Sequence, residues 1–312
     1  MIAVDVMGGD RAPEVTLEGG LAAARTSIPV AFYGPGHRIE QWLYDHDRSW
    51  QSYAISIVDA PEVIDMAAEP VAAVRRYPQS SLVQAVISIT SGKNVAVVSA
   101  GNSGAVMTAA VLFVGRKKGV ERPAISVLLP TQQNPVLALD VGANTECRPC
   151  YLQTFAHLGA HYAEQTMGIM RPRVGLLSNG HEQGKGNSVG KEAFCLLQKD
   201  NLNFIGNIEP YDVFASRADV VVCDGFAGNV LLKTMEAVGA MLAAKAPGLP
   251  AICAPRGGAL LLGVNGTVLI CHGNVSALGI EQAIVQAWNI SLSNNNTNRK
   301  DKYVQNTHKS AY

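Results

Sequence analysis

Short runs of apolar residues alternate with longer segments of mixed polarity along most of the chain. The short runs are rich in valine, isoleucine and leucine, and they predict strands at residues 2–6, 30–33, 54–58, 94–99, 124–129, 136–140, 173–177, 203–205, 219–223 and 267–271. The longer segments have helical spacing and predict helices at residues 13–25, 80–91, 103–114, 149–167, 188–199, 228–244 and 277–292. This alternation is typical of an α/β protein, so we expect a Rossmann-like, three-layer α/β/α sandwich around a mostly parallel sheet.

Two features refine this picture. The six residues between 129 and 136 are too few for a crossover helix, so the strands on either side should form an antiparallel hairpin and make the sheet mixed. No linker rich in proline or serine divides the chain, which favours one two-lobed domain over residues 1–292. Residues 293–312 include Asn294-Asn295-Asn296 and many charges, with little to bury, and predict a disordered tail.

Composition and charge restrict the class of protein. Lys+Arg and Asp+Glu both total 25, so the balanced charge gives no general attraction to nucleic acid. The chain opens on a strand pattern and not on a secretory signal, and its apolar runs are shorter than the roughly 20 residues that span a bilayer. We therefore expect a cytoplasmic protein with no nucleic-acid partner.

Candidate metal ligands are sparse. Cys147 and Cys150 have the C-x-x-C spacing, but the sequence holds no matching second pair, and zinc normally takes four ligands. His157 and His161 lie four residues apart on a predicted helix and lack a third ligand. The sequence therefore predicts no metal site.

Glycine-rich loops follow several of the predicted strands, at residues 5–10, 99–104, 140–144 and 224–229. In open α/β sheets ligands bind at the carboxyl ends of the strands, so we expect these loops to converge on one crevice. Glycine lets backbone N–H groups approach an anion closely, and a following helix adds partial positive charge. The candidate phosphate- or substrate-binding residues are Gly8, Gly9, Asp10, Ser99, Gly101, Asn102, Ser103, Gly104, Asn144, Asp224 and Gly228.

A fifth glycine-rich loop, at residues 180–187, carries Lys185 between two glycines. Its spacing does not match the nucleotide-binding P-loop, and Gly8-Gly9-Asp10 does not match the dinucleotide fingerprint. We therefore expect no nucleotide cofactor, and free phosphate as the anion. The sequence also lacks a G-x-S-x-G nucleophile elbow, which argues against a covalent acyl-enzyme.

Several of these motifs, in this order and spacing, resemble a known family. The segments at residues 2–13, 62–66, 99–105, 139–144, 222–229 and 262–266 are similar to those of the bacterial phosphate acyltransferases of phospholipid synthesis, the PlsX type. The resemblance covers about residues 1–290. It implies an enzyme that moves an acyl group from acyl carrier protein to inorganic phosphate, and a fold related to phosphate acetyltransferases and the isocitrate dehydrogenase group. It also implies a homodimer, and a product used by the membrane acyltransferase acting on glycerol 3-phosphate.

The chain departs from the family pattern at a few places. His181 and Gln183 stand where the family usually has acidic residues, and Cys150 replaces a usual glutamate. Residues 246–255 are a shortened segment with three prolines, where the family carries a longer helical segment associated with the dimer and with membrane contact. We therefore expect only weak peripheral contact with the membrane.

Direct attack of phosphate on a thioester needs a held anion and a stabilised oxyanion. We assign phosphate binding to Lys185 and the backbone of residues 101–104, and oxyanion stabilisation to Asn229 and Asn187. Asp5, Asp10 and Asp224 then orient these donors. The basic run at residues 116–118, with that at 75–76, either steers an acidic carrier protein or is a solvated helix end.

Three alternatives remain open at this stage. The first is a phosphate acetyltransferase-like enzyme that acts on short-chain CoA thioesters. The second is a dehydrogenase of the same fold, and the third is a catalytically impaired scaffold for lipid-synthesis proteins.

Overall fold

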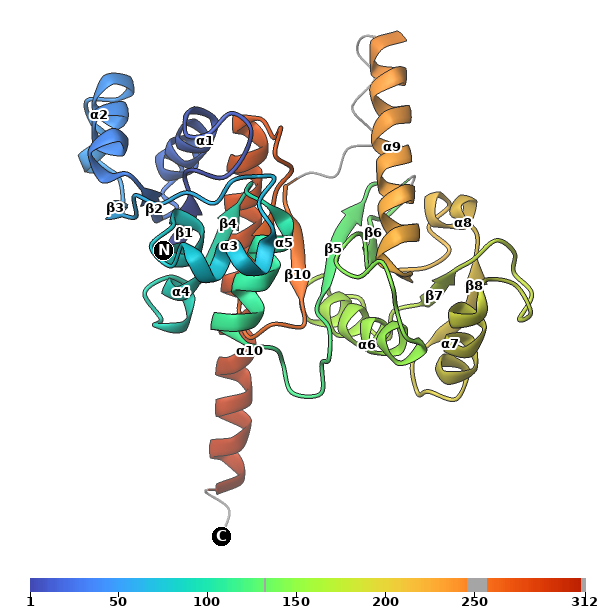
Figure 1. The fold of residues 1–312 in the computed structure, drawn as a ribbon. Helices are drawn as coiled ribbons and strands as arrows, with labels where there is room; N and C mark the ends of the chain where they lie inside the picture. Colours follow the sequence, from blue (N-terminus) through green and yellow to red (C-terminus); the bar gives the residue numbers. More distant parts are fainter. Residues whose placement is uncertain (132, 246–256, 310–312) are drawn as a thin grey trace. The chain divides into compact units, whose positions relative to one another are not determined.

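A computed structural model describes residues 1–131, 133–245 and 257–309. The chain divides into two compact units (Figure 1). Unit 1 comprises Met1–Val114 and Gly266–Tyr312, and unit 2 comprises Gly115–Asn265. The proline-containing segment that the sequence singled out, 246–255, lies outside the described residues, as do Gln132 and the last three residues of the predicted tail.

Unit 1 contains a parallel sheet. Its strands are β1 (Ile2–Asp5), β2 (Val30–Gly34), β3 (Ile55–Asp59), β4 (Ala96–Ser99) and β11 (Thr267–Ile270). They run in the order β3-β2-β1-β4-β11, and every neighbouring pair is parallel. Strands β1, β2, β4 and β11 are buried along their whole length, which explains their nearly continuous apolar sequences.

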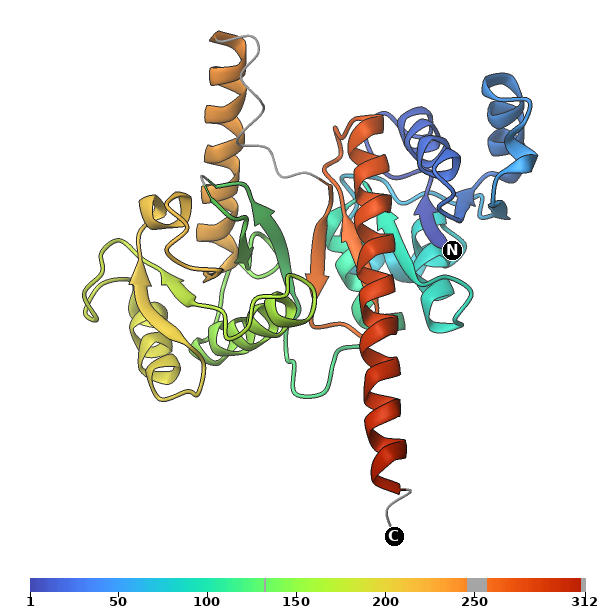
Figure 2. The ribbon, with the colours of Figure 1, turned by 180° about the vertical axis from the view of Figure 1, so that it is seen from behind.

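Helices cover both faces of this sheet. They are α1 (Glu14–Arg25), α2 (Gly36–His46), α3 (Pro70–Arg76), α4 (Ser81–Thr90), α5 (Ser103–Ala109) and α10 (Ala277–Lys309), with short turns of 3-10 helix at Trp50–Ser52 and π-helix at Ala110–Val114. Helices α1 and α10 pack against each other on one face, and α4 and α5 pack together on the other. In Figure 2, α10 lies in front of the strands. In Figure 1, which views the opposite face, α3, α4 and α5 lie in front of them.

Unit 2 contains a mixed sheet. Its strands are β5 (Ala124–Leu129), β6 (Val136–Leu139), β7 (Val174–Leu177), β8 (Phe204–Ile208), β9 (Val220–Val222) and β10 (Ala259–Leu262). They run in the order β10-β5-β6-β9-β7-β8, and β5 pairs antiparallel with both of its neighbours. The predicted hairpin between β5 and β6 is confirmed. The remaining pairs, β6-β9, β9-β7 and β7-β8, are parallel.

The helices of unit 2 also lie on two sides of its sheet. They are α6 (Pro149–Gln165), α7 (Ser188–Gln198), α8 (Pro210–Phe214) and α9 (Gly225–Lys245). Helices α6 and α7 pack together, while α9 contacts β6 from the other side (Figure 1). Together the two units confirm the predicted fold class, an α/β protein with mostly parallel, mixed strand pairing.

Some elements differ from the sequence-based expectation. The prediction did not include β10, α2, α3 and α8. Helices α3 and α8 have only 7 and 5 residues, too short for a periodic pattern. Helix α9 begins at Gly225 and not at 228, so the predicted loop 224–229 is largely its first turn. Helix α10 continues to Lys309 through residues for which we predicted a disordered tail; no glycine or proline after Gly279 interrupts it.

The helices show no candidate for a membrane span. Within the three described ranges, no helix combines the length and the apolar composition needed to cross a bilayer.

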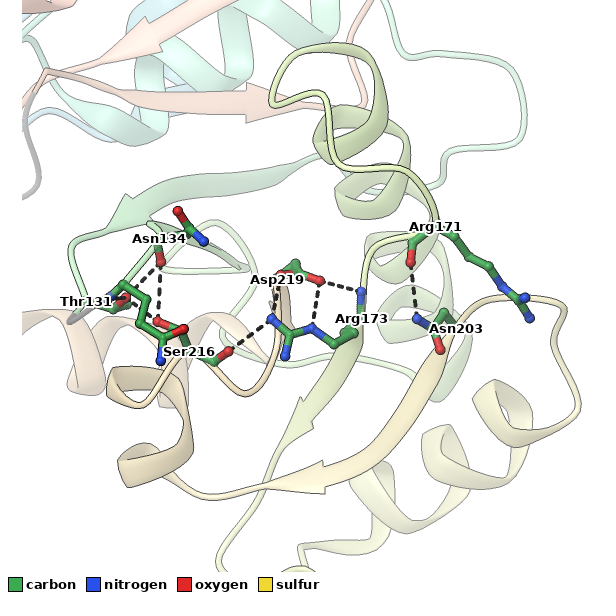
Figure 3. A network of polar contacts seen from close by, with 8 residues as sticks. Thr131, Asn134, Arg171, Arg173, Asn203, Ser216 and Asp219 are labelled. Carbon is green, nitrogen blue, oxygen red and sulfur yellow. Dashed lines mark hydrogen bonds and ion pairs between the residues drawn. The ribbon is translucent and has the colours of Figure 1, made fainter.

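A polar network ties together the amino ends of three strands of unit 2 (Figure 3). Arg173, just before β7, donates from Nε (3.0 Å) and Nη2 (2.8 Å) to the carboxylate of Asp219, just before β9. The Arg173 backbone N–H reaches the same carboxylate at 2.7 Å, and Nη2 also donates to the Ser216 carbonyl. The Ser216 hydroxyl bonds that of Thr131 in the β5–β6 loop. Within unit 2, the network lies at the edge of the sheet opposite to the loops that follow β6, β7 and β9.

This network yields a stability prediction for Asp219→Asn. Burial alone would raise the pKa of Asp219, but the hydrogen bonds from Arg173 outweigh it and hold the pKa below its usual value. A lowered carboxyl pKa contributes stability at neutral pH that is lost as pH falls through the folded-state value. We expect the variant to lose about 1–2 kcal/mol in urea unfolding at pH 7, and the difference to shrink below about pH 4.

The control is Glu14→Gln, which breaks the Arg38–Glu14 pair. Those side chains are 55% and 60% exposed, and water screens them, so the change should be within about 0.5 kcal/mol. An Asp219→Asn protein as stable as the wild type at pH 7 would contradict the prediction.

Candidate functional site

The first set of candidate residues in unit 1 surrounds a buried carboxylate. Asp5 ends β1 and accepts hydrogen bonds from the hydroxyls of Ser81 (2.5 Å) and Ser99 (2.7 Å). The Ser99 hydroxyl also accepts the Gly101 N–H at 3.0 Å. Burial raises the pKa of Asp5, and the hydroxyl donors oppose that rise. Asp5 therefore joins β1, α4 and β4, and the Ser99 hydroxyl is engaged within the protein.

The loops after β1 and β4 lie in direct contact. A Cβ atom added at Gly8 would be 2.6 Å from both Asp5 Oδ2 and Gly101 N, so only glycine fits there. The Asp10 N–H donates to the carbonyl of Gly273, in the loop that follows β11. Strands β1, β4 and β11 are neighbours and parallel, so the structure brings these three loops to one edge of the unit 1 sheet.

Asn102 joins the loop after β4 to the loop before α3. Its Nδ2 donates to the carbonyls of Met66 (3.0 Å) and Ala68 (2.9 Å), and its Oδ1 accepts the N–H of Ala105. The side chain of Asn102 is thus used to hold the loop before α3 against α5. By contrast, the backbone N–H groups of Ser103 and Gly104 have no acceptor within the described residues and remain available as donors.

In unit 2 the corresponding centre is Asp140, which follows β6 and is fully buried. Its carboxylate accepts four backbone N–H groups, from Ile125, Gly142, Ala143 and Asn144, at 2.7–3.2 Å. The Asn144 side chain adds a fifth donor at 2.8 Å and also bonds the Pro123 carbonyl. Burial raises the pKa of Asp140, while the N–H donors lower it. Asn144 is therefore committed to shaping this loop.

The start of α9 packs directly on the Asp140 loop. The Gly225 N–H donates to the Asn144 carbonyl at 2.7 Å, and the Asp224 carboxylate accepts the Ala227 N–H at 2.8 Å as a helix cap. A Cβ added at Gly228 would be 2.0 Å from the Asp140 carbonyl oxygen. Asn229 faces Gly142, and among the described residues its side-chain amide has no hydrogen-bond partner. This amide is free to bind a substrate.

The Lys185 loop connects β7 to α7. Gly186 N–H donates to Asn179 Oδ1 (2.9 Å), and Lys185 N–H donates to the Glu182 carbonyl (3.0 Å). Asn187 caps α7 by accepting the Gly190 N–H at its Oδ1, which leaves the Asn187 Nδ2 free to donate. The Lys185 ammonium has no ion-pair partner in the described part of the chain.

Strand order explains how the candidates of unit 2 come together. Strands β6, β9 and β7 are adjacent and parallel, so the Asp140 loop, the start of α9 and the Lys185 loop all emerge at one edge of its sheet. The candidate residues thus form one cluster in each unit. A single crevice for all of them stays a prediction.

Comparison with known proteins identifies the family. Residues 1–246 match the family model described as "Fatty acid synthesis protein". The "Phosphate acyltransferase" of Pelotomaculum thermopropionicum is 42% identical, over 91% of this chain and 89% of its own. That of Geobacter sp. (strain M21) is also 42% identical, over 96% of this chain and 92% of its own. The chain belongs to the phosphate acyltransferase family.

Solved structures share the fold of this chain at low sequence identity. A phosphotransacetylase from Streptococcus pyogenes is 17% identical with a TM-score of 0.66, over 93% of both chains. A 4-hydroxythreonine-4-phosphate dehydrogenase from Klebsiella pneumoniae is 16% identical with a TM-score of 0.60, over 93% of this chain and 99% of its own. These likenesses agree with the predicted fold relationship and concern the fold alone.

The thiols near the Asp140 loop are unsuited to nucleophilic chemistry. Cys147 donates to the Asn144 carbonyl, and burial raises its pKa to about 11. Burial likewise raises the pKa of Cys223, which donates to the Asp140 carbonyl. Both thiols are therefore protonated at neutral pH, where a thiolate would be the nucleophile. Within the described ranges, no cluster of three His, Cys, Asp or Glu residues is arranged to bind a metal.

Sequence reasoning assigned no role to three residues that organise the clusters. Asp140 ends the predicted strand 136–140 and begins the predicted loop 140–144, and an Asp before Val-Gly-Ala-Asn is a signal for a carboxylate that accepts loop N–H groups. Ser81 lies 76 positions from its partner Asp5, and His181 lies 31 positions from its partner Asp212. No local pattern could have joined these pairs.

Proposed function

We propose that this protein transfers a fatty acyl group from acyl carrier protein to inorganic phosphate. A phosphate oxygen attacks the thioester carbonyl carbon, the carbon–sulfur bond breaks, and the products are acyl phosphate and the carrier thiol. The observation that carries the proposal is that the glycine-rich loops hold Lys185 and hydrogen-bond donors that have no partner among the described residues. Relatives of the chain are named phosphate acyltransferase. These groups suit an anion and a developing oxyanion, and the reaction needs no enzyme nucleophile.

Within unit 2 we assign phosphate binding to Lys185 and oxyanion stabilisation to the side-chain amides of Asn229 and Asn187. The open N–H groups of Ser103 and Gly104 in unit 1 are further anion donors. Ser99, Asn102 and Asn144 act by holding their loops in shape, because their side chains are engaged within the protein. Asp224 has the same supporting role as the cap of α9.

The proposed partners follow from the proposed substrate. The acyl donor is acyl carrier protein, an acidic protein that the exposed Lys117 and Lys118 would attract. The product is then consumed by an acyltransferase that acts on glycerol 3-phosphate at the membrane. We also propose a homodimer in the cytoplasm, with weak peripheral membrane contact, which analytical ultracentrifugation and liposome sedimentation would test.

A direct assay tests the activity. Purified protein is incubated with acyl-ACP and phosphate, and acyl phosphate is trapped with hydroxylamine as the hydroxamate. We expect phosphate-dependent hydroxamate from long-chain acyl-ACP and much less from acetyl-CoA. A preference for acetyl-CoA would indicate a phosphate acetyltransferase, and no product from either donor would favour a scaffold.

Asn229→Ala should lower turnover about tenfold to a hundredfold with little change in the KM for either substrate. The amide is free in the structure and, on this proposal, bonds the oxygen only as charge develops in the transition state. Steady-state kinetics with acyl-ACP and phosphate measure the change. The control is Asn201→Ala, an exposed asparagine beyond the end of α7. A rise in KM with unchanged kcat would instead make Asn229 a ground-state ligand.

A further inference from the structure

A charge-assisted contact joins the Lys185 loop to α8. His181 Nε2 lies 2.6 Å from Asp212 Oδ2, and because a carboxylate only accepts hydrogen bonds, the imidazole is the donor. Asp212 is buried, and its other oxygen accepts from Arg217 Nη1 at 3.0 Å. Burial opposes ionisation of Asp212, but the Glu209 N–H, His181 and Arg217 outweigh it and lower its pKa. Asp212 is thus an ionised, well-held anchor.

The position of His181 in the loop couples this anchor to Lys185. His181 stands between Gly180 and Glu182, and the Glu182 carbonyl accepts both the Lys185 N–H and the Asn207 side-chain amide. The stem of Lys185 rests on Gly180: a Cβ added there would be 2.8 Å from Lys185 Cγ and 3.1 Å from Cδ. Gly180 therefore provides the surface under the Lys185 stem, and Glu182 closes the turn that leads to Lys185.

We infer that His181 is a positioning residue, whose hydrogen bond to Asp212 holds the loop so that Lys185 is presented to the phosphate. This inference rests on the proposed function. Without the bond, the loop would retain its turn and the Asn207 contact but lose its tie to α8. If the loop is displaced part of the time, the apparent affinity for phosphate falls in proportion to the fraction of molecules whose loop is anchored.

The experiment compares two substitutions at His181. His181→Ala removes the donor, whereas His181→Gln places an amide N–H at about the reach of Nε2. We expect His181→Ala to raise the KM for phosphate about threefold to tenfold, with a smaller effect on the KM for acyl-ACP. His181→Gln should restore the phosphate KM to within about twofold of the wild type. Asp212 itself is a poor target, because it also caps α8 and binds Arg217.

A matched control is available on α6. His157 Nε2 lies 2.8 Å from Asp200 Oδ2, and His157 is 48% exposed against 51% for His181. This pair lies away from the Lys185 loop, at the junction of α6 with the end of α7. His157→Ala should leave the kinetics for both substrates unchanged.

A second measurement does not depend on catalysis. Amide hydrogen exchange of residues 179–187 should be about threefold to tenfold faster in His181→Ala than in the wild type, and close to the wild type in His181→Gln. Unchanged exchange in His181→Ala overturns the inference, as does an unchanged phosphate KM or a Gln variant as impaired as the Ala variant. If the wild type forms no acyl phosphate, the proposed function fails, and exchange alone then decides whether His181 anchors the loop.

Discussion

Lys185→Ala should lower kcat/KM for phosphate about a hundredfold while the protein remains folded. The lysine is exposed, its ammonium has no ion-pair partner in the described residues, and its stem lies over Gly180 of the same loop. Its removal therefore costs little packing but takes away the one cation of the loop. Phosphate is dianionic or monoanionic near neutral pH. The loss of the lysine charge should therefore raise the KM for phosphate and also lower kcat.

Two companion variants separate charge from other effects. Lys185→Arg keeps the positive charge and should recover part of the activity, whereas Lys199→Ala removes an exposed lysine at the far end of α7 and should have no effect. Circular dichroism and urea unfolding verify the fold of each variant. A folded Lys185→Ala protein with wild-type phosphate kinetics would contradict the proposed role of Lys185 in binding phosphate.

Gly228→Ala should destabilise unit 2 by about 3 kcal/mol and abolish most activity. The added methyl carbon would lie 2.0 Å from the Asp140 carbonyl oxygen and 2.8 Å from Cys223 Sγ. Alanine normally favours a helix by about 1 kcal/mol over glycine, so the expected loss has the opposite sign to helix propensity. The clashing Asp140 carbonyl belongs to the backbone and cannot rotate away as a side chain could. The first turn of α9 must therefore move off the Asp140 loop and carry Asn229 with it.

Thermal and urea unfolding measure the stability change, and the hydroxamate assay measures the activity. The control is Gly184→Ala, where an added Cβ meets nothing within 4 Å and the stability should change by less than about 0.5 kcal/mol. A Gly228→Ala protein of wild-type stability would mean that α9 and the Asp140 loop are not packed as tightly as described.

The two clusters share one design. In each unit a buried aspartate at a strand end, Asp5 or Asp140, binds the loops around it, and glycines let those loops approach closely. The polar side chains nearest the aspartates are engaged within the protein. Groups without a partner among the described residues include the N–H groups of Ser103 and Gly104 and the Asn229 amide. On the proposed function, these hydrogen bonds would hold the donors in place before the substrate binds, which is what electrostatic stabilisation of a transition state requires.

Much of the fold could be predicted from the sequence. Ten of the strands were placed to within a few residues, because buried parallel strands are apolar runs bounded by turn residues. Strand β10 was missed because its sequence, Ala259–Leu262, consists of alanine and leucine and has no β-branched residue that would favour a strand over a helix. Helix α2 was missed because it buries only Ile39 and Leu43, so its apolar face is narrow.

The sequence by itself determined the α/β class, the hairpin, the family and the loops that carry the candidate chemistry. These follow from local properties: the period of apolar residues, the number of residues in a connection, and glycine at strand ends. Only the tertiary structure decided which polar side chains are free. Asn102 and Asn229 look alike in the sequence, yet the first is engaged with Met66 and Ala68 and the second is open. The physical reason is that a hydrogen bond depends on partners brought together by folding, such as His181 and Asp212, which no local pattern encodes.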